Sequence, residues 1–355
     1  MNFELTETET ARAEKEKRNI QRSTYSMWST FRDCRKRYYW RWIEKLEPNY
    51  RDPKLALGTL VHQCLESWYY PSDASPDHRR EKIAQIIDES TPERDTDPQE
   101  RKNWHLAHAM MNAYYAQYPR EDFQVLSVET EFESPIINPD SDRVSRTFIM
   151  AGKIDGLVRR DDGYWIIEHK TTANLNSDYL ESIWCDFQIR LYAHFIEQSQ
   201  GIHVAGIIYN ILTKPQIRQG RGETEEEFDI RCQDLMAKSG KQTTTAKRKQ
   251  DEPDEVFRAR LTERLAEPMA FHRVELPYDR ATSLPLLREL WELTKSWLDA
   301  NNREAWYQNT RQCFHWGMKC PYFALCSSNG SQLVRQNDYH YHEPNPELRT
   351  PDNGD

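Results

Sequence analysis

Three side chains in the middle of the chain have the chemistry to hold a divalent cation and to control a water molecule beside it. They are Asp155, Glu168 and Lys170, within the stretch GKIDGLVRRDDGYWIIEHKTT from Gly152 to Thr172. Mg²⁺ and Mn²⁺ prefer oxygen ligands and need only one or two carboxylates when a phosphate group supplies further oxygens. A neighbouring lysine can orient or deprotonate the water that such a cation activates. The alternative is an exposed hairpin whose Glu and Lys are merely solvated, because so short a pattern is common.

The same stretch has the composition of two strands joined by a tight turn. The runs IDGLVRR and YWIIEHK are rich in β-branched and aromatic residues, and Asp162-Gly163 between them tolerates the positive φ angles of a two-residue turn. That turn predicts that Asp155 lies opposite Lys170. Side chains alternate along a strand, so Glu168 would point to the same side as Lys170, and all three would share one face. A one-residue slip would send Asp155 to the other face.

The elements that must position this hairpin follow from the hydrophobic pattern on either side of it. Residues 123–136 and 146–154 alternate with a period of two and are predicted strands. Residues 179–198 carry an apolar stripe of helical period, and HVAGIIYNIL at 203–212 is an apolar strand that would lie parallel to the sheet after that crossover helix. The sequence therefore predicts an α/β fold, with a mixed central sheet in αβββαβ order flanked by helices.

Two predicted helices place polar side chains one turn apart. Residues 57–70, LGTLVHQCLESWYY, are a predicted helix on which His62 and Glu66 are neighbours. Gln188 and Tyr192 have the same spacing on the helix of residues 179–198. A lone helical histidine is more often structural than a ligand, so His62 on its own would be assigned to packing.

An aromatic and basic segment precedes these elements. Residues 23–46, STYSMWSTFRDCRKRYYWRWIEKL, begin with helix-capping Ser and Thr and are predicted to form a helix dense in rings and cations. Interleaved cations and rings, here Arg35, Arg37 and Arg41 among others, can follow phosphates and stack on bases. The alternative is a core helix whose rings pack while its cations extend to solvent.

Three cysteines near the end of the chain have metal-ligand spacing. Cys313, Cys320 and Cys326 follow a C-x6-C-x5-C pattern within NTRQCFHWGMKCPYFALC. They need one distant thiol to complete a four-thiolate site, and Cys34 in the aromatic and basic segment is the candidate. An iron-sulfur cluster and zinc remain alternatives, with His315 a possible substitute ligand for zinc. Three unlinked cysteines in a packed turn are the third interpretation.

Composition limits the class of protein. The chain has 355 residues, with 37% hydrophobic and 30% charged residues and a formal net charge of −9, and it contains no apolar run of membrane-spanning length. We expect a cytoplasmic protein with a local basic channel at most. The expected organisation is a polar tail at 1–22, one domain at 23–330 and a polar tail at 331–355. Within the domain we expect a helical insertion at about 73–120, a polar insertion at about 214–265 that brings Lys214 and Arg218 within reach of a phosphate backbone, and a cysteine region at 309–326.

Taken together, these motifs resemble the PD-(D/E)XK nuclease superfamily, and specifically its RecB-like branch, which includes CRISPR-associated and phage exonucleases that carry an iron-sulfur cluster. The matching motifs occur in the family's order: His62 in GTLVHQCLE, Asp155 in GKID, Glu168 and Lys170 in EHK, Gln188 and Tyr192 in QIRLY, and the split set of cysteines. The chain departs from the pattern where Ile154 replaces the proline of the superfamily's name and where residues 214–265 have no counterpart in the minimal core.

The resemblance implies a restriction-endonuclease-like fold and a role for each matching residue. His62, Asp155 and Glu168, with the carbonyl of His169, would hold Mg²⁺ or Mn²⁺. Lys170 would position the attacking water and stabilise the charge on the phosphorane, which leaves 5′-phosphate and 3′-hydroxyl ends. Gln188 and Tyr192 would hold the DNA backbone or order the catalytic face. Cys34, Cys313, Cys320 and Cys326 would hold a structural [4Fe–4S] cluster, or Zn²⁺ in the alternative.

The function expected on this basis is a metal-dependent DNA exonuclease that acts on single strands or DNA ends in recombination, repair or phage DNA processing. A helicase, a recombinase or a single-strand-binding protein is a possible partner, and no membrane is involved. One alternative is a non-catalytic DNA-binding or recombination scaffold on the same fold, which would have lost a carboxylate or Lys170; both carboxylates and Lys170 are present. The other alternative is a zinc-stabilised protein-interaction module, which leaves the hairpin unexplained.

Overall fold

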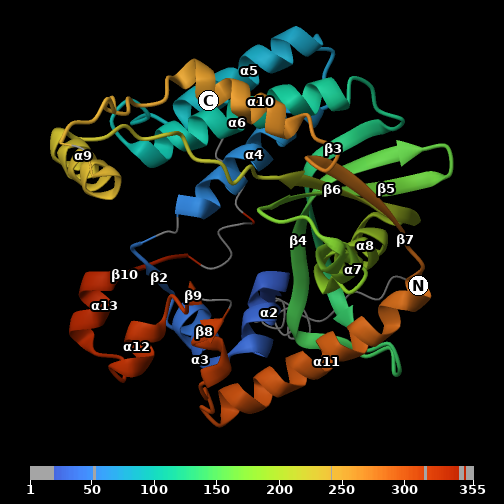
Figure 1. Ribbon diagram of the computed structural model, residues 1–355. Coiled ribbons are helices and arrows are strands. Elements are labelled where there is room, and N and C mark those ends of the chain that lie inside the picture. Colours follow the sequence, from blue (N-terminus) through green and yellow to red (C-terminus); the bar gives the residue numbers. More distant parts are fainter. Residues whose placement is uncertain (1–19, 51–52, 241, 316–317, 344–347, 349–355) are drawn as a thin grey trace, which may run out of the picture.

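The computed structural model describes residues 20–50, 53–240, 242–315, 318–343 and 348 (Figure 1). Within these residues, none of the helices has the length and apolar character needed to cross a membrane. The helices outside the C-terminal region are α2 (Tyr25–Asp33), α3 (Arg35–Tyr38), the π-helical turn η1 (Tyr39–Ile43), α4 (Pro53–Tyr69), α5 (Pro76–Glu89), α6 (Pro98–Gln117), α7 (Ser177–Ile183), α8 (Phe187–Gln200), α9 (Glu225–Ser239), α10 (Asp254–Leu265) and α11 (Arg280–Asn302).

A mixed sheet of six strands forms the centre of the molecule. Its strands are β1 (Gln21–Ser23), β3 (Gln124–Ile137), β4 (Val144–Arg160), β5 (Gly163–Thr172), β6 (Val204–Thr213) and β7 (Phe271–Pro277). The strands β3, β4 and β5 pair antiparallel, β6 lies parallel to β5, and β7 lies antiparallel to β6. The helix α8 connects β5 to β6, so the predicted αβββαβ order and the mixed sheet flanked by helices are confirmed.

Alternation along the strands produces a core on each face of this sheet. On β6, Ile207 and Ile211 pack in a core with α2, α8 and α11, while Ile208 and Leu212 pack in a second core with α4, α5, α6 and α10. A strand buried on both faces has to be apolar throughout, which is why 203–212 lacks a polar side. The one exception in the middle of β6 is Asn210, which is fully buried.

The N-terminal segment of residues 39–48 meets the C-terminal region in a small cluster that lies apart from the sheet (Figure 1). It contains β2 (Leu46–Pro48), η2 (Thr310–Gln312), β8 (Phe314–His315), β9 (Met318–Lys319), α12 (Phe323–Ser327), α13 (Gln332–Asp338) and β10 (Tyr339–Tyr341). Trp40 and Leu46 from the N-terminal segment pack there on Tyr322, Leu325 and Tyr339, and β10 pairs with β2. The expectation of a polar tail is therefore corrected for residues 332–341; residues 1–19 of the other expected tail lie outside the described part.

The aromatic and basic segment at 23–46 is not the single helix that was predicted. The chain is extended at Cys34, with φ −159° and ψ 109°, so that α2 ends at Asp33 and α3 begins at Arg35. The turn η1 and the strand β2 complete the segment. After the break, Tyr38 packs in the main core while Trp40, two residues later and about 200° around the helix, packs in the C-terminal cluster.

The register of the central hairpin also differs from the prediction. Arg160 pairs with Gly163 and Gly156 with Ile167, so the two turn residues are Asp161 and Asp162. Gly163, at φ +140°, is the first residue of β5. Continuing this register brings Asp155 opposite Glu168, and not opposite Lys170. The shift is by two residues along one strand, so it does not exchange the faces of the hairpin.

Gly152 on β4 is a position where a side chain has no room. A Cβ atom there would lie 2.5 Å from Cζ of Phe132 and 3.2 Å from Cε1 of Tyr192, two buried rings. We expect Gly152→Ala to lower the free energy of unfolding by about 1–3 kcal/mol through overpacking, measured by urea denaturation. Combining it with Phe132→Leu should recover part of that loss. An unchanged loss in the Phe132→Leu background would show that contact with this ring is not the cause.

Candidate active site

The predicted carboxylates and lysine lie close together on the paired strands β4 and β5, with Asp155 on β4 and Glu168 and Lys170 on β5. Oδ2 of Asp155 accepts a hydrogen bond of 2.7 Å from the backbone N–H of His169. Nζ of Lys170 donates to Oε1 of Glu168 at 2.6 Å. Glu168 is only 4% exposed, so this is a short contact between opposite charges in a nearly dry environment.

The helix α4 adds His62 to these groups. Nδ1 of His62 lies 3.7 Å from Oδ2 of Asp155, and its side chain is 34% exposed. The ring of His62 also stands edge-on to the ring of His169, with 6.1 Å between the centroids. Since α4 packs on the sheet through Leu57, Val61 and other apolar residues, its core packing determines where His62 lies. The prediction that His62 is a ligand of a cation remains a prediction.

The electrostatics of the site separate its two carboxylates. Burial alone would raise the pKa of Asp155, but the nearby His62 and the hydrogen bond from the backbone N–H of His169 lower it below the usual value. Burial and the negative charge of Asp155 raise the pKa of Glu168, against the opposing effect of Lys170. Burial would lower the pKa of Lys170, yet the charge of Glu168 and their hydrogen bond raise it above its usual value. Lys170 is therefore a cation at neutral pH.

The helix α8 contributes Gln188 and Tyr192 in different ways. Oε1 of Gln188 accepts a second hydrogen bond from Nζ of Lys170, at 3.3 Å. Gln188 is itself held at the start of α8, where the side chain of Asp186 accepts from its backbone N–H. Tyr192 is only 6% exposed, and its ring lies against Phe132 in the core. In this arrangement Gln188 orders the lysine, and Tyr192 supports the sheet behind it.

A buried polar network behind the site was not predicted from the sequence. Nδ2 of Asn210 lies 2.8 Å from Nδ1 of His169, and Oδ1 of Asn210 accepts from the Arg273 guanidinium at 3.3 Å. Because arginine only donates, the amide of Asn210 must donate to His169, which makes Nδ1 an acceptor and puts the ring proton on Nε2. Burial lowers the pKa of His169 to about 3, so the ring is neutral.

The same network extends to an ion pair on the far side of Asn210. Arg273 and Glu121 are joined by contacts of 2.5 and 2.8 Å, and the hydroxyl groups of Tyr69 and Tyr114 accept from the same guanidinium at 2.9 Å. The ring of Tyr69 stacks on His169 with 5.5 Å between centroids. The network thus fixes the side chain of His169, the residue between Glu168 and Lys170 in the sequence. Its one detectable sign in the sequence was Asn210, a polar residue inside an apolar strand.

The donor set fits a hard cation that shares its coordination with a substrate. One oxygen of Asp155 and one of Glu168 are used by the contacts above, which leaves the other oxygen of each without a hydrogen bond to any described group. Within the described residues, no group of three or more His, Cys, Asp or Glu side chains is arranged to hold an ion. Mg²⁺ commonly uses one or two carboxylates and takes its remaining ligands from water and phosphate.

The raised pKa of Glu168 makes binding of such a cation dependent on pH. A proton bound to Glu168 must leave before its carboxylate can be a ligand, so lowering the pH through this raised pKa should weaken Mn²⁺ binding, by up to tenfold for each pH unit. Titration of Mn²⁺ by calorimetry between about pH 8 and pH 5.5 would measure it. Glu168→Gln should bind Mn²⁺ more weakly and without this dependence. An equal pH dependence in that variant would assign the effect to another group.

The predicted DNA-binding arginines of the N-terminal segment have intramolecular partners. Arg35 lies over the rings of Phe31 and Tyr307 and donates to Ser296. Arg37 pairs with Asp33. Arg41 lies over the ring of Trp42. These contacts are those of a packed helix, and a role of the three arginines in binding DNA stays a prediction. Lys214 and Arg218 instead line a cavity beyond the end of β6.

The four predicted cluster cysteines gather where the N-terminal segment meets the C-terminal region. All four are free thiols. Burial raises the pKa of Cys320, and nearby Cys326 and Cys34 raise it further; burial likewise raises the pKa of Cys326, as do Cys34 and Cys313. Trp40 donates to Sγ of Cys326, and the backbone N–H of Asn309 donates to Sγ of Cys34, each at 3.4 Å. His315 is exposed on β8.

Comparison with known proteins agrees with this geometry. The model of the PD-(D/E)XK nuclease superfamily matches residues 22–327, so the chain belongs to that superfamily. Members are generally nucleases that typically use Mg²⁺ or Mn²⁺ and bind DNA. Comparison with curated proteins finds no match. Among solved structures, the crystal structure of SSO0001 matches 70% of this chain and 77% of its own at 12% identity, with a TM-score of 0.26, which is too low to carry an argument.

Proposed function

We propose that this chain is a metal-dependent DNA exonuclease of the RecB-like branch, acting on single strands or DNA ends. The observation that carries the proposal is the position of Lys170, held between the carboxylate of Glu168 and the amide of Gln188 and next to Asp155. A chain that had become a DNA-binding scaffold would have no reason to keep a buried carboxylate, a second carboxylate and a half-buried cation in this arrangement. Processing of DNA in recombination, repair or phage replication is the corresponding role.

The residues of the site suggest how the phosphodiester bond is cleaved. A bound divalent cation would lower the pKa of water and neutralise charge on the phosphate. His62 and the N–H of His169 hold Asp155 in place as its ligand, with Glu168 as the second carboxylate. Lys170 is protonated, so it would donate to the attacking oxygen and to the charge that develops on the phosphorane. Attack on phosphorus breaks the P–O3′ bond, and the 3′-oxygen takes up a proton, leaving 5′-phosphate and 3′-hydroxyl ends.

The test is digestion of DNA labelled at its 5′ or 3′ end, single-stranded or duplex, in Mg²⁺, Mn²⁺ or EDTA. We expect cleavage that requires the metal and that releases short labelled products from one end, which also gives the polarity. Cleavage of a circular single strand would contradict the exonuclease assignment while leaving the nuclease assignment standing. Binding without cleavage in either metal would instead favour the scaffold, which would serve a helicase, recombinase or single-strand-binding partner.

We further propose that Cys34, Cys313, Cys320 and Cys326 hold a [4Fe–4S] cluster. The observation that supports it is the proximity of the thiols: besides burial, Cys326 and Cys34 raise the pKa of Cys320, and Cys34 and Cys313 raise the pKa of Cys326. Such a cluster would join both ends of the chain and stabilise the fold.

Replacing one ligand tests this cofactor. Protein purified without oxygen should contain about four iron atoms per chain and absorb near 400 nm. Cys326→Ser should lose most of the iron and unfold at a lower temperature, because cluster binding contributes to folding free energy. Cys185→Ser, which changes an exposed cysteine between α7 and α8, should keep both. One zinc ion per chain in place of iron would establish the zinc alternative.

A further inference from the structure

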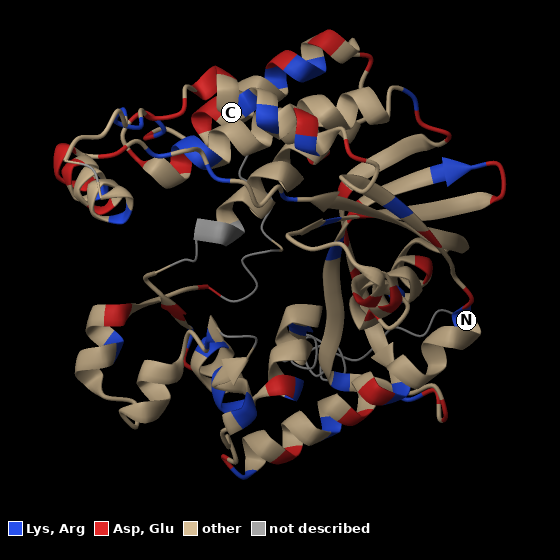
Figure 2. Ribbon diagram, viewed as in Figure 1, with Lys and Arg blue, Asp and Glu red and all other residues tan. Residues whose placement is uncertain are grey.

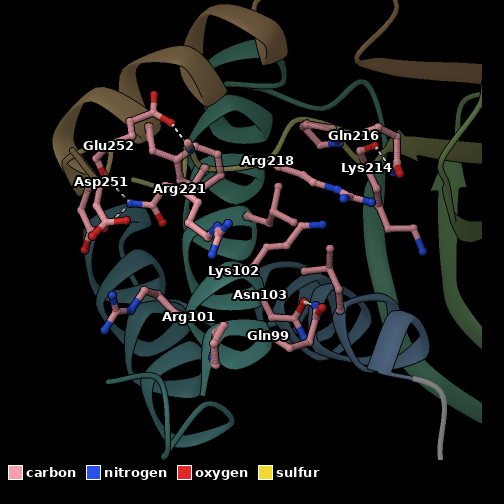
Figure 3. A pocket seen from close by; sticks show the side chains of 18 of the residues that line it. Gln99, Arg101, Lys102, Asn103, Lys214, Gln216, Arg218, Arg221, Asp251 and Glu252 are labelled. Atoms are coloured by element: carbon pink, nitrogen blue, oxygen red, sulfur yellow. Dashed lines mark hydrogen bonds between the residues drawn. The ribbon is translucent and has the colours of Figure 1, made fainter. Parts of the chain in front are cut away.

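A cavity of about 1090 Å³ opens next to the candidate active site (Figure 3). Its lining includes Ala173, three residues after Lys170, and Lys214, which follows β6. It also includes Leu57, five residues before His62 and therefore about 7.5 Å along α4 from it. The cavity thus begins at the carboxyl ends of the two central parallel strands and leads away from the site.

The two walls of this cavity come from different segments and both carry cations. Arg101 and Lys102 belong to the first turns of α6, while Lys214, Arg218 and Arg221 belong to the segment after β6. We call this cavity, with its five cations, the basic groove. Acidic and basic residues are mixed along α11 and over α10 (Figure 2), and the formal net charge of the chain is −9. The groove is therefore a local feature in an acidic protein.

The carboxylates that line the groove are already bound within the protein. Glu252 accepts from Arg260 and from the N–H of Gly220. Asp254 accepts from Gln219 at 2.7 Å, and Asp251 accepts from the N–H of Gly222 at 2.8 Å. These three acids hold the loop in shape, and none of them forms an ion pair with Lys102 or Arg218.

Two of the five cations, Lys102 and Arg218, are less compensated, whereas Arg221 pairs with Glu227. Among the described residues, neither the ammonium group of Lys102 nor the guanidinium group of Arg218 has a hydrogen bond or an ion pair. Arg101 donates only to the backbone carbonyl groups of Arg94 and Asp95. Figure 3 shows Lys102 and Arg218 directed from opposite walls toward the same space. Cations facing each other across water without an anion repel, so an anionic ligand between them would be stabilised by both.

We propose that the basic groove binds the phosphate backbone of a single DNA strand next to the phosphate that is cleaved. One strand between the walls can be contacted by Lys102 and Arg218 together. Among the described residues that line the groove, Phe257 is the only aromatic one and it is buried, so recognition would run through phosphates and would be independent of base sequence. The helical insertion that contains α6 is then one wall of the substrate site. This proposal rests on the proposed function for its choice of ligand.

The experiment measures binding of a labelled oligothymidylate of about 20 nucleotides in EDTA by fluorescence anisotropy at several salt concentrations. We expect Lys102→Gln and Arg218→Gln each to weaken binding by about five- to tenfold at low salt. Each should also reduce the slope of log K against log salt by about 0.7. Lys102→Arg keeps the positive charge and should therefore bind the strand as the wild type does. Lys295→Gln, which removes a charge from the exposed Lys295–Glu292 pair on α11, should bind as the wild type does.

Wild-type affinity for the strand in both groove variants, or no binding by the wild type, would overturn the proposal. A loss confined to a hairpin duplex of the same length would assign the groove to duplex DNA and also overturn it. The nuclease function is judged separately, from cleavage by the wild type in Mn²⁺. If the wild type cleaves DNA and the groove variants bind the strand normally, the groove proposal is wrong and the nuclease proposal stands. If binding depends on the groove but the wild type does not cleave, the nuclease proposal is wrong and the groove proposal stands.

Discussion

Replacement of Lys170 by methionine should reduce the rate of metal-dependent DNA cleavage by about 10²–10⁴-fold and leave binding of DNA in EDTA within about threefold. Methionine keeps much of the side-chain volume but removes the one cation that contacts Glu168 and Gln188. Loss of a donor aimed at charge that develops in the transition state has effects of this size, because the donor acts where water is largely excluded. End-labelled strands digested in Mn²⁺ under single-turnover conditions give the measurement.

Two controls separate this effect from damage to the fold. Lys295→Met makes the same substitution at an exposed position on α11 and should cleave at the wild-type rate. Asp155→Asn should be as inactive as Lys170→Met, because it removes a carboxylate from the other side of the same site. If Lys170→Met cleaved at more than about a tenth of the wild-type rate, Lys170 would have no direct part in the chemistry, and the protonated lysine would be a partner of Glu168 alone.

For the hairpin that carries these residues, the local sequence predicts the strands but not their register. Strand periodicity is a local property, so the strands and their αβββαβ order followed from the residues themselves. The register did not, since Asp161, Asp162 and Gly163 offer two ways to place a two-residue turn, and Gly163 takes its positive φ at the start of β5. The error preserved the faces only because it amounted to an even number of residues.

The break at Cys34 and the network around Asn210 lay beyond sequence reasoning for a different reason. Both depend on segments distant in the chain that compete for the same side chains. Tyr38 and Trp40 pack in two separate cores, and the hydrophobic periodicity within 23–46 does not indicate which core each of them enters. Arg273 meets Glu121 across 152 positions of sequence, and partners at such distances leave no local pattern. The polar Asn210 in an apolar strand indicated a buried partner without identifying it.

The largest stability effect is expected from the ion pair in that network. Arg273→Met should lower the free energy of unfolding by about 3–5 kcal/mol, measured by urea denaturation, because it leaves a largely buried carboxylate without its cation. The side chains of Arg273 and Glu121 are 17% and 16% exposed, and Tyr69, Tyr114 and Asn210 would lose a donor at the same time. Arg288→Met provides the matched control, since Arg288 also pairs with a carboxylate, Asp140, through more than one hydrogen bond, but at 55% and 57% exposure. There we expect a loss of less than about 1 kcal/mol.

The double variant Glu121→Gln with Arg273→Met distinguishes the ion pair from simple packing. Removing both charges leaves no unpaired buried ion, so the double variant should be more stable than Arg273→Met alone. It should still cleave DNA more slowly than the wild type, because Asn210 without Arg273 is free to turn its amide and His169 loses its fixed tautomer. Recovery of stability without recovery of rate would establish the network as a positioning device for the strand that carries Glu168 and Lys170. Full recovery of stability and of cleavage rate would show that Arg273 and Glu121 form only a structural ion pair.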